Sequence, residues 1–443
     1  YQSNEEMPRQ AESLPHVIQR MAERDITFSY KGDWQTSTAY LQNDIIKESN
    51  IVYVVISDHT SGNFADDLAA NKLAVYQGAT LLELQQSAGS NNIGFSHSEA
   101  YAQGTVGASL KKFVTPLDSP YNASGNGIDD DTAAIQAMLN SDAEHVHFPA
   151  GFNFRIVDSL KNGTPVLISN KANRRITCDG FITATTTVLR AIGIYGANSF
   201  IQINFDGNNK IAEGVRVYAD GCIVEGCRIS DLYTTTYSAV GIGTSNVNGG
   251  VIVRNNIIKN LNSVGNGTLG DGNGMSRGIL LSMNANATSE SIIEGNIVEN
   301  CIGEEGDAIA IISSNGAGVY YDSCVTIRNN IIKNFTRRGI KVQANKNKVI
   351  GNYFNHSFAS SSEIPNRMTV IDFVQGGSNY AIENILDACK WFGQISVYAT
   401  SPDSFNNFFI ENNKILGIGS ETTNPAISII PLGSNVFIRG NKI

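Results

Sequence analysis

The feature that most constrains the fold of this chain is a short strand pattern that recurs along its second half. The pattern reads apolar-x-apolar-x-Gly/Asn-Asn-x-Ile and is clearest at 223–229, 251–258, 291–298 and 325–332, with weaker copies at 349–354, 380–386, 408–415 and 436–443. One marker position per copy gives Cys227, Asn256, Asn296, Asn330, Asn352, Asn384, Asn413 and Asn441. The intervals between them are 29, 40, 34, 22, 32, 29 and 28 residues. A spacing of about thirty residues with loops of variable length predicts a β-solenoid with about three strands per coil.

Each coil of such a solenoid needs inward apolar side chains at every second position and a sharp bend between strands. Asn tolerates the left-handed backbone at a bend, and Asn side chains stacked along the axis can hydrogen-bond to one another. Leucine-rich repeats would show Leu-x-x-Leu-x-Leu at a stricter period, which this chain lacks. A TIM barrel would need helical patterns between the strands, and none follows Leu139. The sequence therefore predicts an all-β chain folded as a parallel β-helix.

A more specific segment precedes the repeats, YNASGNGIDDDTAAIQAMLNSDAEHVHFPAGFNFRI at 121–156. Its residues from Asp129 to Thr132 can cap a helix at 132–139, which carries the apolar residues Ala134, Ile135, Met138 and Leu139. Such a helix would seal the first coil, as the terminal unit of a solenoid must. The segment resembles the start of the pectate-lyase-like β-helices of bacteriophage tailspikes and polysaccharide-degrading enzymes.

The resemblance implies a right-handed parallel β-helix and the activity of a capsular polysaccharide depolymerase, with no cofactor. It implies an endo-glycoside hydrolase that binds and cuts a bacterial capsular or exopolysaccharide. It also implies a homotrimer on the virion tail, in contact with other tail or baseplate proteins, that is synthesised in the host cytoplasm and acts outside the cell.

Four regions are expected along the chain. Residues 1–24 are predicted to form a short helix, which is either a surface helix or a neck that packs against copies of itself. Residues 25–77 resemble a small carbohydrate-binding-module β-domain, and we expect its aromatic residues to form its own core. Residues 78–116 are predicted to be a linker, and 117–443 the β-helix catalytic domain. The last copy of the repeat ends the sequence without a capping pattern, so we expect a C-terminal cap that is missing here.

Composition excludes several classes of function. The net charge of −9 would repel nucleic acid, and no run of Lys and Arg overrides it. No apolar stretch is long enough to predict a membrane span. Six cysteines are scattered without the spacing of a zinc site, so we expect buried thiols and no metal.

Candidate chemistry lies in a second family of strands, at 239–245, 276–282, 306–312, 337–343 and 369–375. If Ile279, Ile309 and Ile340 point inward, then Gly278, Ala308 and Gly339 are predicted to form a flat outward floor for a sugar chain. The alternative is that these small residues only permit tight stacking of coils or of subunits.

Charged residues stand at the start of these strands. Asp307 is expected between Arg277 and Arg338 on successive coils and therefore to be ionised, which suits a nucleophile, a base or a group that orients the substrate. Glu304 and Glu305 precede it on an acidic turn, and one of them is predicted to be the proton donor. Glycoside hydrolysis needs such a carboxyl pair about 5–5.5 Å apart for retention of configuration and about 6.5–9.5 Å for inversion.

Further candidates complete the predicted site. Asp271 is an additional acid on the longest insertion. The residues predicted to bind substrate are Arg277, Arg338, Lys341, Asp372 and Trp391.

Three alternatives stay open. The charges can be a structural ion ladder. The basic residues can instead neutralise a uronate and remove a proton in a polysaccharide lyase. The chain can also be an adhesin that holds a glycan without cutting it.

Overall fold

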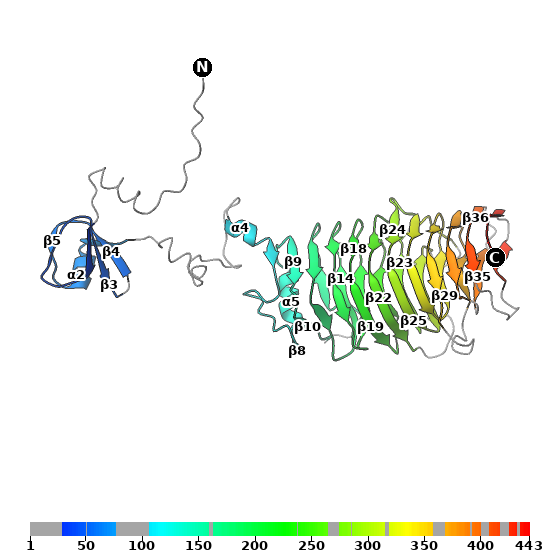
Figure 1. The fold of residues 1–443 in the computed structure, drawn as a ribbon, viewed down its shortest axis with the longest axis horizontal. Helices are drawn as coiled ribbons and strands as arrows, with labels where there is room; N and C mark the ends of the chain where they lie inside the picture. The colour runs from blue at the N-terminus through cyan, green and yellow to red at the C-terminus, as the bar shows by residue number, and fades with distance from the viewer. Residues whose placement is uncertain are drawn as a thin grey trace, which may run out of the picture. The chain divides into compact units, whose positions relative to one another are not determined.

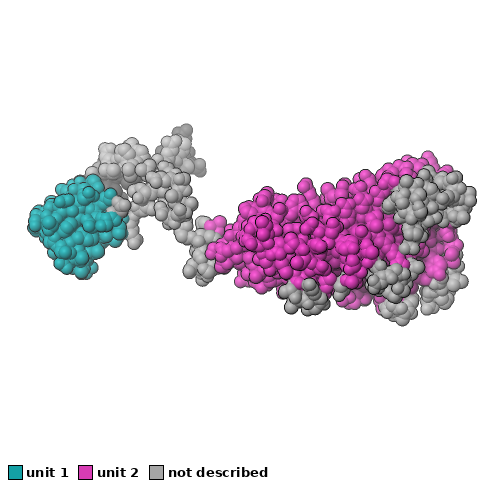
Figure 2. Space-filling model, turned by 90° about the horizontal axis from the view of Figure 1, so that it is seen from below, with its two compact units in different colours: residues 1–95 teal, residues 96–443 magenta. Residues whose placement is uncertain are grey.

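The computed structural model describes residues 29–49, 51–76, 106–158, 163–236, 238–264, 274–284, 286–314, 319–357, 368–389, 392–399, 407–416, 425–431 and 435–443. The chain divides into two compact units, Tyr1–Phe95 and Ser96–Ile443, which Figure 2 colours separately. The helix predicted at 1–24 and residues 78–105 of the predicted linker lie outside the described residues.

The described residues of the smaller unit, 29–49 and 51–76, form a β-domain with one short helix. Its four-stranded sheet has the order β1-β3-β4-β6, and β2 pairs with β5. The bounds are β1 Ser29–Asp33, β2 Ala39–Tyr40, β3 Asp44–Glu48, β4 Ile51–Val55, β5 His59–Thr60, α2 Phe64–Ala69 and β6 Leu73–Val75. Tyr40 and Tyr53 are buried in its core, and Trp34 packs against that core with its ring edge-on to Phe64. The expectation that these aromatic rings form the core of the small domain is confirmed.

The larger unit is a parallel β-helix whose described strands form three long sheets (Figure 1). The twelve-stranded sheet contains β7 Phe113–Val114, β9 His145–Phe148, β12 Arg175–Cys178, β15 Phe200–Ile201, β18 Ile223–Glu225, β21 Ile252–Arg254, β24 Ser291–Glu294, β27 Val325–Arg328, β30 Lys348–Ile350, β33 Asn379–Ile382, β36 Asn407–Glu411 and β39 Asn435–Arg439. The eleven-stranded sheet contains β8 Asn126–Asp130, β10 Asn153–Arg155, β13 Phe181–Thr183, β16 Asn204–Asp206, β19 Arg228–Thr234, β22 Ile257–Ser263, β25 Ile297–Gly303, β28 Ile331–Phe335, β31 Tyr353–Asn355, β34 Ile385–Asp387 and β37 Lys414–Leu416. The ten-stranded sheet contains β11 Leu167–Ser169, β14 Val188–Ile194, β17 Ile211–Val217, β20 Ala239–Thr244, β23 Met275–Ser282, β26 Glu305–Ile312, β29 Arg338–Gln343, β32 Thr369–Val374, β35 Gly393–Ala399 and β38 Ile427–Pro431.

One coil takes one strand from each sheet in turn, as β24, β25 and β26 do, and each strand pairs in parallel with the equivalent strand of the next coil. Inward residues such as Ile293, Val298 and Ile309 are fully buried in one continuous core. Because each strand between the two ends of a sheet is hydrogen-bonded on both sides, the backbone polar groups of these inner strands are satisfied. The predicted all-β parallel β-helix is confirmed.

The marker residues of the sequence pattern form a hydrogen-bonded ladder between the twelve- and eleven-stranded sheets. The Asn256 side-chain amide donates to Oδ1 of Asn296 at 2.9 Å, Asn296 donates to Asn330 at 2.9 Å, and Asn330 donates to Asn352 at 2.9 Å. The same bond continues to the later markers Asn384, Asn413 and Asn441. The residue before each marker takes the left-handed backbone, which Asn or Gly adopts at low cost and which explains the Gly/Asn-Asn pair in the repeat.

The predicted capping helix is present as α5, Thr132–Leu139. Ile135, Met138 and Leu139 are buried against the core. The Gln136 side chain accepts a hydrogen bond from the Ile168 N–H at 2.8 Å and donates to the Ile168 carbonyl at 3.0 Å. This amide therefore replaces a neighbouring strand for β11 and covers the first edge of the ten-stranded sheet.

The β-helix begins slightly earlier than the sequence indicated. A short helix, α4 Val106–Leu110, and the first strand of the twelve-stranded sheet, β7, both fall in the segment assigned above to a linker. β7 pairs in parallel with β9 through Phe113 and Val114. The other domain limits stay predictions.

The cysteines are unpaired thiols, and all except Cys324 are buried. Burial raises the pKa of Cys178, Cys227 and Cys301 to about 12, so these thiols are neutral and unreactive. Within the described part of the chain, no three His, Cys, Asp or Glu side chains are grouped as a metal site would require. None of the helices formed by the described residues has the length and apolarity needed to cross a membrane.

Candidate functional site

The charged residues predicted from the sequence are brought together on the outer face of the ten-stranded sheet. Arg277 of β23 pairs in register with Asp307 of β26, which pairs with Arg338 of β29. Lys341 of β29 pairs with Asp372 of β32. These side chains face outward. Ala308 and Ile309 are two successive residues of the core, so Asp307 before them lies on the outer face, and Lys341 follows the inward Ile340.

Three guanidiniums and three carboxylates alternate in this network. Glu305 accepts from Arg337 Nη1 at 2.6 Å and from Arg277 Nη2 at 3.3 Å. Arg277 Nε lies 3.8 Å from Asp307 Oδ2. Arg338 then links Asp307, at 3.3 Å from Nη1, to Asp372, at 2.7 Å from Nε. We call these residues the ion network.

Most of the ion network is buried although it lies on an outer face. The side chain of Asp307 is 0% exposed and that of Arg277 is 4% exposed, whereas Glu305 retains 16%. Asp307 Oδ2 and Arg277 Nε are buried without a hydrogen-bond partner among the described residues. Glu305 is therefore the carboxylate of the ion network with the most accessible surface. Asp307 is buried and contacts the guanidiniums of Arg277 and Arg338.

The electrostatic environment of the two basic residues of β29 differs. Burial alone would lower the pKa of Arg338, but the carboxylates of Asp307 and Asp372 hold it above its ordinary value. Burial, together with the nearby charges of Arg277 and Arg338, lowers the pKa of Lys341, although Asp307 opposes this. Lys341 therefore releases its proton more readily than an ordinary lysine.

The tight corner between β25 and β26 positions Glu304 and Glu305. The Gly303 N–H donates to Thr336 Oγ1 of the next coil at 3.1 Å, and the Thr336 hydroxyl donates back to the Gly303 carbonyl. A Cβ added to Gly306 would lie 2.0 Å from Thr336 Oγ1, so only glycine permits this close approach. Glu304 Oε2 is buried at the corner without a hydrogen-bond partner among the described residues.

Glu304 and Glu305 were predicted to lie on an acidic turn. Glu305 is held by Arg277 and Arg337, and Arg337 was not among the predicted residues. The adjacent arginines at 337 and 338 were the sequence signal for it. The Met368 sulfur completes the site, at 3.2 Å from Arg337 Nε and 2.9 Å from Arg338 Nη2.

The predicted outward floor of small residues is wrong. Ala308 is fully buried in the main core. A Cβ on Gly278 would lie 2.3 Å from the inward side chain of Val298, and one on Gly339 would lie 2.8 Å from the inward ring of Phe354. These positions follow the corner, where two successive residues point inward, so their small size serves packing of the core.

A second charged cluster lies earlier on the same face and was missed. Glu213 of β17 accepts from Arg190 Nε at 2.7 Å and from Arg216 Nη2 at 2.6 Å. The charged positions within the otherwise apolar strands at 188–194 and 211–217 were the available signal. A small outer apolar cluster that includes Val240 and Leu280 lies between these residues and the ion network.

Two predicted site residues are not placed. Asp271 and Trp391 lie outside the described residues.

In sequence the chain is similar to a phage tail spike protein, and in fold it is similar to a tailspike protein and to a bacterial surface adhesin. No protein-family model matches the chain. The tail spike protein of Salmonella phage epsilon15 is 28% identical over 178 residues, which is 39% of this chain and 16% of that relative's own length. The Dettilon tailspike protein is 20% identical with a TM-score of 0.50, over 82% of this chain and 72% of that one.

The surface protein and adhesin PfbA of Streptococcus pneumoniae has a similar fold, with 15% identity and a TM-score of 0.51 over 74% of this chain and 96% of its own. The chain is thus a parallel β-helix protein of the type found in phage tailspikes. In sequence, a segment of it resembles a phage tail spike protein.

Proposed function

We propose that the chain is the glycan-handling part of a phage tailspike, which binds a bacterial capsular or exopolysaccharide and cuts it by endo-glycoside hydrolysis. The sequence match to a phage tail spike protein supports the choice of protein class. The observation that carries the proposed activity is Glu305, a partly exposed carboxylate fixed by two guanidiniums, with a second carboxylic acid, Glu304, next to it in the chain.

Glu305 and Glu304 take the two roles that glycoside hydrolysis requires. Arg277 and Arg337 stabilise the charge of Glu305, which therefore acts as the nucleophile or as the base that activates water. Glu304 has a buried oxygen that no arginine or other described donor contacts, which favours it as the group that delivers a proton to the leaving oxygen.

The remaining residues of the ion network position this pair. Asp307 and Asp372 fix Arg338, and Asp307 also lies against Arg277, so the guanidinium that holds Glu305 is itself held in place. Such support restricts the side chains that face the substrate. Lys341 and the arginines attract an acidic polysaccharide locally, against the net charge of −9.

A lyase is the second candidate, and Lys341 is the observation that favours it. Burial and two neighbouring guanidiniums lower the pKa of Lys341, so its amine is better suited than an ordinary lysine to remove a proton next to a uronate carboxylate. Arg277 and Arg338 would neutralise that carboxylate, but both are already paired with Asp307, which makes hydrolysis the better supported reaction.

We also propose that the protein is a homotrimer on the virion tail, in contact with other tail or baseplate proteins. Asp271 would serve as an additional acid and Trp391 as a residue that stacks on the sugar.

Incubation with purified bacterial polysaccharides tests the proposal. Chain length is followed by size-exclusion chromatography, and ultraviolet absorbance of an unsaturated uronate separates a lyase from a hydrolase. We expect shortening without new absorbance, lost in Glu305→Gln and in Glu304→Gln. Glu294→Gln is the matched control, because Glu294 is also paired with an arginine, at 2.6 Å from Arg328, but on the twelve-stranded sheet.

Two results would overturn this assignment. Binding without shortening of any polysaccharide would make the chain an adhesin. Near-full activity in both the Glu305 and the Glu304 variants would place the reaction elsewhere.

A further inference from the structure

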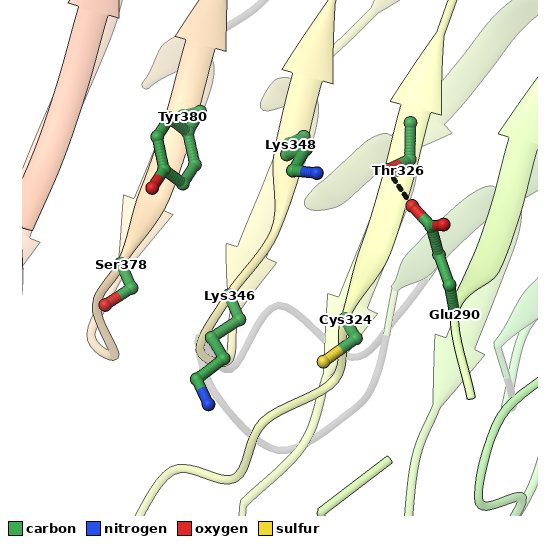
Figure 3. Close-up of a pocket in the computed structure, with 7 residues that line it drawn as sticks. All are labelled: Glu290, Cys324, Thr326, Lys346, Lys348, Ser378 and Tyr380. Carbon is green, nitrogen blue, oxygen red and sulfur yellow. Dashed lines mark hydrogen bonds between the residues drawn. The ribbon is translucent and has the colours of Figure 1, made fainter. Parts of the chain in front are cut away.

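A hollow of about 450 Å³ opens on the outer face of the twelve-stranded sheet (Figure 3). Thr326 of β27, Lys348 of β30 and Tyr380 of β33 stand in register on successive strands. The remaining lining residues, which precede these strands in the chain, are Glu290, Cys324, Lys346 and Ser378. The volume lies within the range of small-ligand pockets, roughly 300–1,000 Å³.

Of the two lysines that line the hollow, Lys348 has no ion-pair partner among the described residues. Thr326 Oγ1 donates to Glu290 Oε1 at 2.5 Å, and Lys346 Nζ lies 2.6 Å from Asp322 Oδ2. Among the described residues, no carboxylate is within ion-pair distance of Lys348, although Glu290 lines the same hollow. The hollow therefore offers a free ammonium donor beside hydroxyl groups and a carboxylate acceptor.

One wall of the hollow is an aromatic ring held in a stack. The Tyr380 ring lies parallel to that of Phe409, with centroids 4.6 Å apart and an interplanar angle of 5°. Phe409 stacks in turn on Phe437 at 4.9 Å. Phe409 pairs with Tyr380 on the next strand and covers one face of its ring, so the stack fixes the orientation of the ring that lines the hollow at low entropic cost.

We propose that this hollow binds an acidic saccharide unit, with the sugar carboxylate on Lys348 and the sugar hydroxyl groups on Glu290, Ser378 and Tyr380. A saccharide both donates and accepts hydrogen bonds around its ring, as the mixed polar lining requires. The choice of a saccharide rests on the proposed function, whereas the free ammonium and the hollow do not. The site lies on a different sheet from Glu305, so it holds the polymer without taking part in its cleavage.

Thiol chemistry at Cys324 does not explain the hollow. Partial burial raises the pKa of this thiol, and the nearby carboxylate of Asp322 acts in the same direction. A neutral thiol is a weak nucleophile at neutral pH.

Titration of the whole chain with glucuronate tests the proposal, with glucose as the neutral probe and binding followed by ligand-observed NMR. We expect glucuronate to bind more tightly than glucose, and Lys348→Met to weaken glucuronate binding about tenfold, because a charge-assisted contact is lost. Lys333→Met is the matched control, since Lys333 lies on β28 of the eleven-stranded sheet. Its glucuronate affinity should equal that of the unmodified chain.

Cleavage and binding are read separately. A Lys348-dependent glucuronate site in a chain that cuts no polysaccharide would overturn the proposed function and leave the hollow as a saccharide site. Equal binding of glucuronate to Lys348→Met and the unmodified chain, or no binding of glucuronate, would overturn the inference even if the chain is a depolymerase.

Discussion

Substitution of Asp307 by Asn tests whether this buried carboxylate stabilises the fold by holding the arginines of the ion network, as distinct from the role proposed for Glu305 in the reaction. Asp307 is 0% exposed and contacts Arg338 at 3.3 Å and Arg277 at 3.8 Å, so the change removes a charge from between two buried guanidiniums while it keeps the shape of the side chain. Loss of one partner of a buried ion pair costs about 3–5 kcal/mol, because the remaining charge stays desolvated. Both arginines keep a second carboxylate, Glu305 or Asp372, so we expect the lower end, about 3 kcal/mol.

The assay is the free energy of unfolding of the larger unit in urea, measured for Asp307→Asn and for Glu305→Gln. Glu305 is 16% exposed and its charge is partly screened by solvent, so we expect Glu305→Gln to cost less than Asp307→Asn. A double substitution of Asp307→Asn with Arg338→Gln should cost less than the sum of the single changes, because the two side chains are in contact. Unfolding of Asp307→Asn at the same urea concentration as the unmodified chain would refute the argument that the network is desolvated.

Three further predictions concern the fold that holds the site. Asn330→Ala leaves the Asn296 N–H and the Ile293 carbonyl without these partners in a buried corner, so it should lower the unfolding free energy in urea by roughly 2–6 kcal/mol. The control is Asn300→Gly, a change in a more exposed asparagine ladder. A difference of less than about 0.5 kcal/mol between the two variants would contradict the prediction. Burial lowers the pKa of His356 to about 4 from 6.5, so the unfolded chain takes up this proton first as the pH falls. His356 should therefore not affect the unfolding free energy above pH 6.5, and its contribution should lower that free energy by about 3 kcal/mol between pH 6.5 and pH 4. The same pH dependence in His356→Gln would show that another group is responsible. Gly278→Ala places a Cβ 2.3 Å from Val298 Cγ1, so its thermal unfolding midpoint should fall by several degrees, and an unchanged midpoint would show that the corner relaxes freely.

The sequence was most informative where one local pattern controls one local structure. The Gly/Asn-Asn pair predicted the bend, because the left-handed backbone depends on the residue type at one position. Its return in successive coils predicted the stacked amides, because the ladder joins the same position of neighbouring coils. The capping helix was predicted from its apolar spacing and from the aspartates at its start. Its hydrogen bonds through Gln136 to the edge of β11 were not predicted, because Gln136 lies outside the repeat and no recurring pattern relates it to Ile168, 32 positions away.

The candidate site was predicted in part for the same reason. Register between coils places Arg277, Asp307 and Arg338 in one column, and the repeat interval gave that register. The direction of Gly278 and Ala308 was predicted wrongly, because strict alternation fails at a corner where two successive residues point inward.

The hollow at Lys348 gave no sequence signal. Its central residues Thr326, Lys348 and Tyr380 come from three coils, and only the pairing of β27, β30 and β33 brings them together.

The most direct test of the proposed activity compares the unmodified chain with Glu305→Gln on a single bacterial polysaccharide that both of them bind. The number of new reducing ends is followed over time. We predict a steady increase with the unmodified chain and none with Glu305→Gln, at equal binding of the polymer. Equal rates of increase in the two proteins would contradict the assignment of the reaction to the outer face of the ten-stranded sheet, and no increase with either would contradict the depolymerase itself.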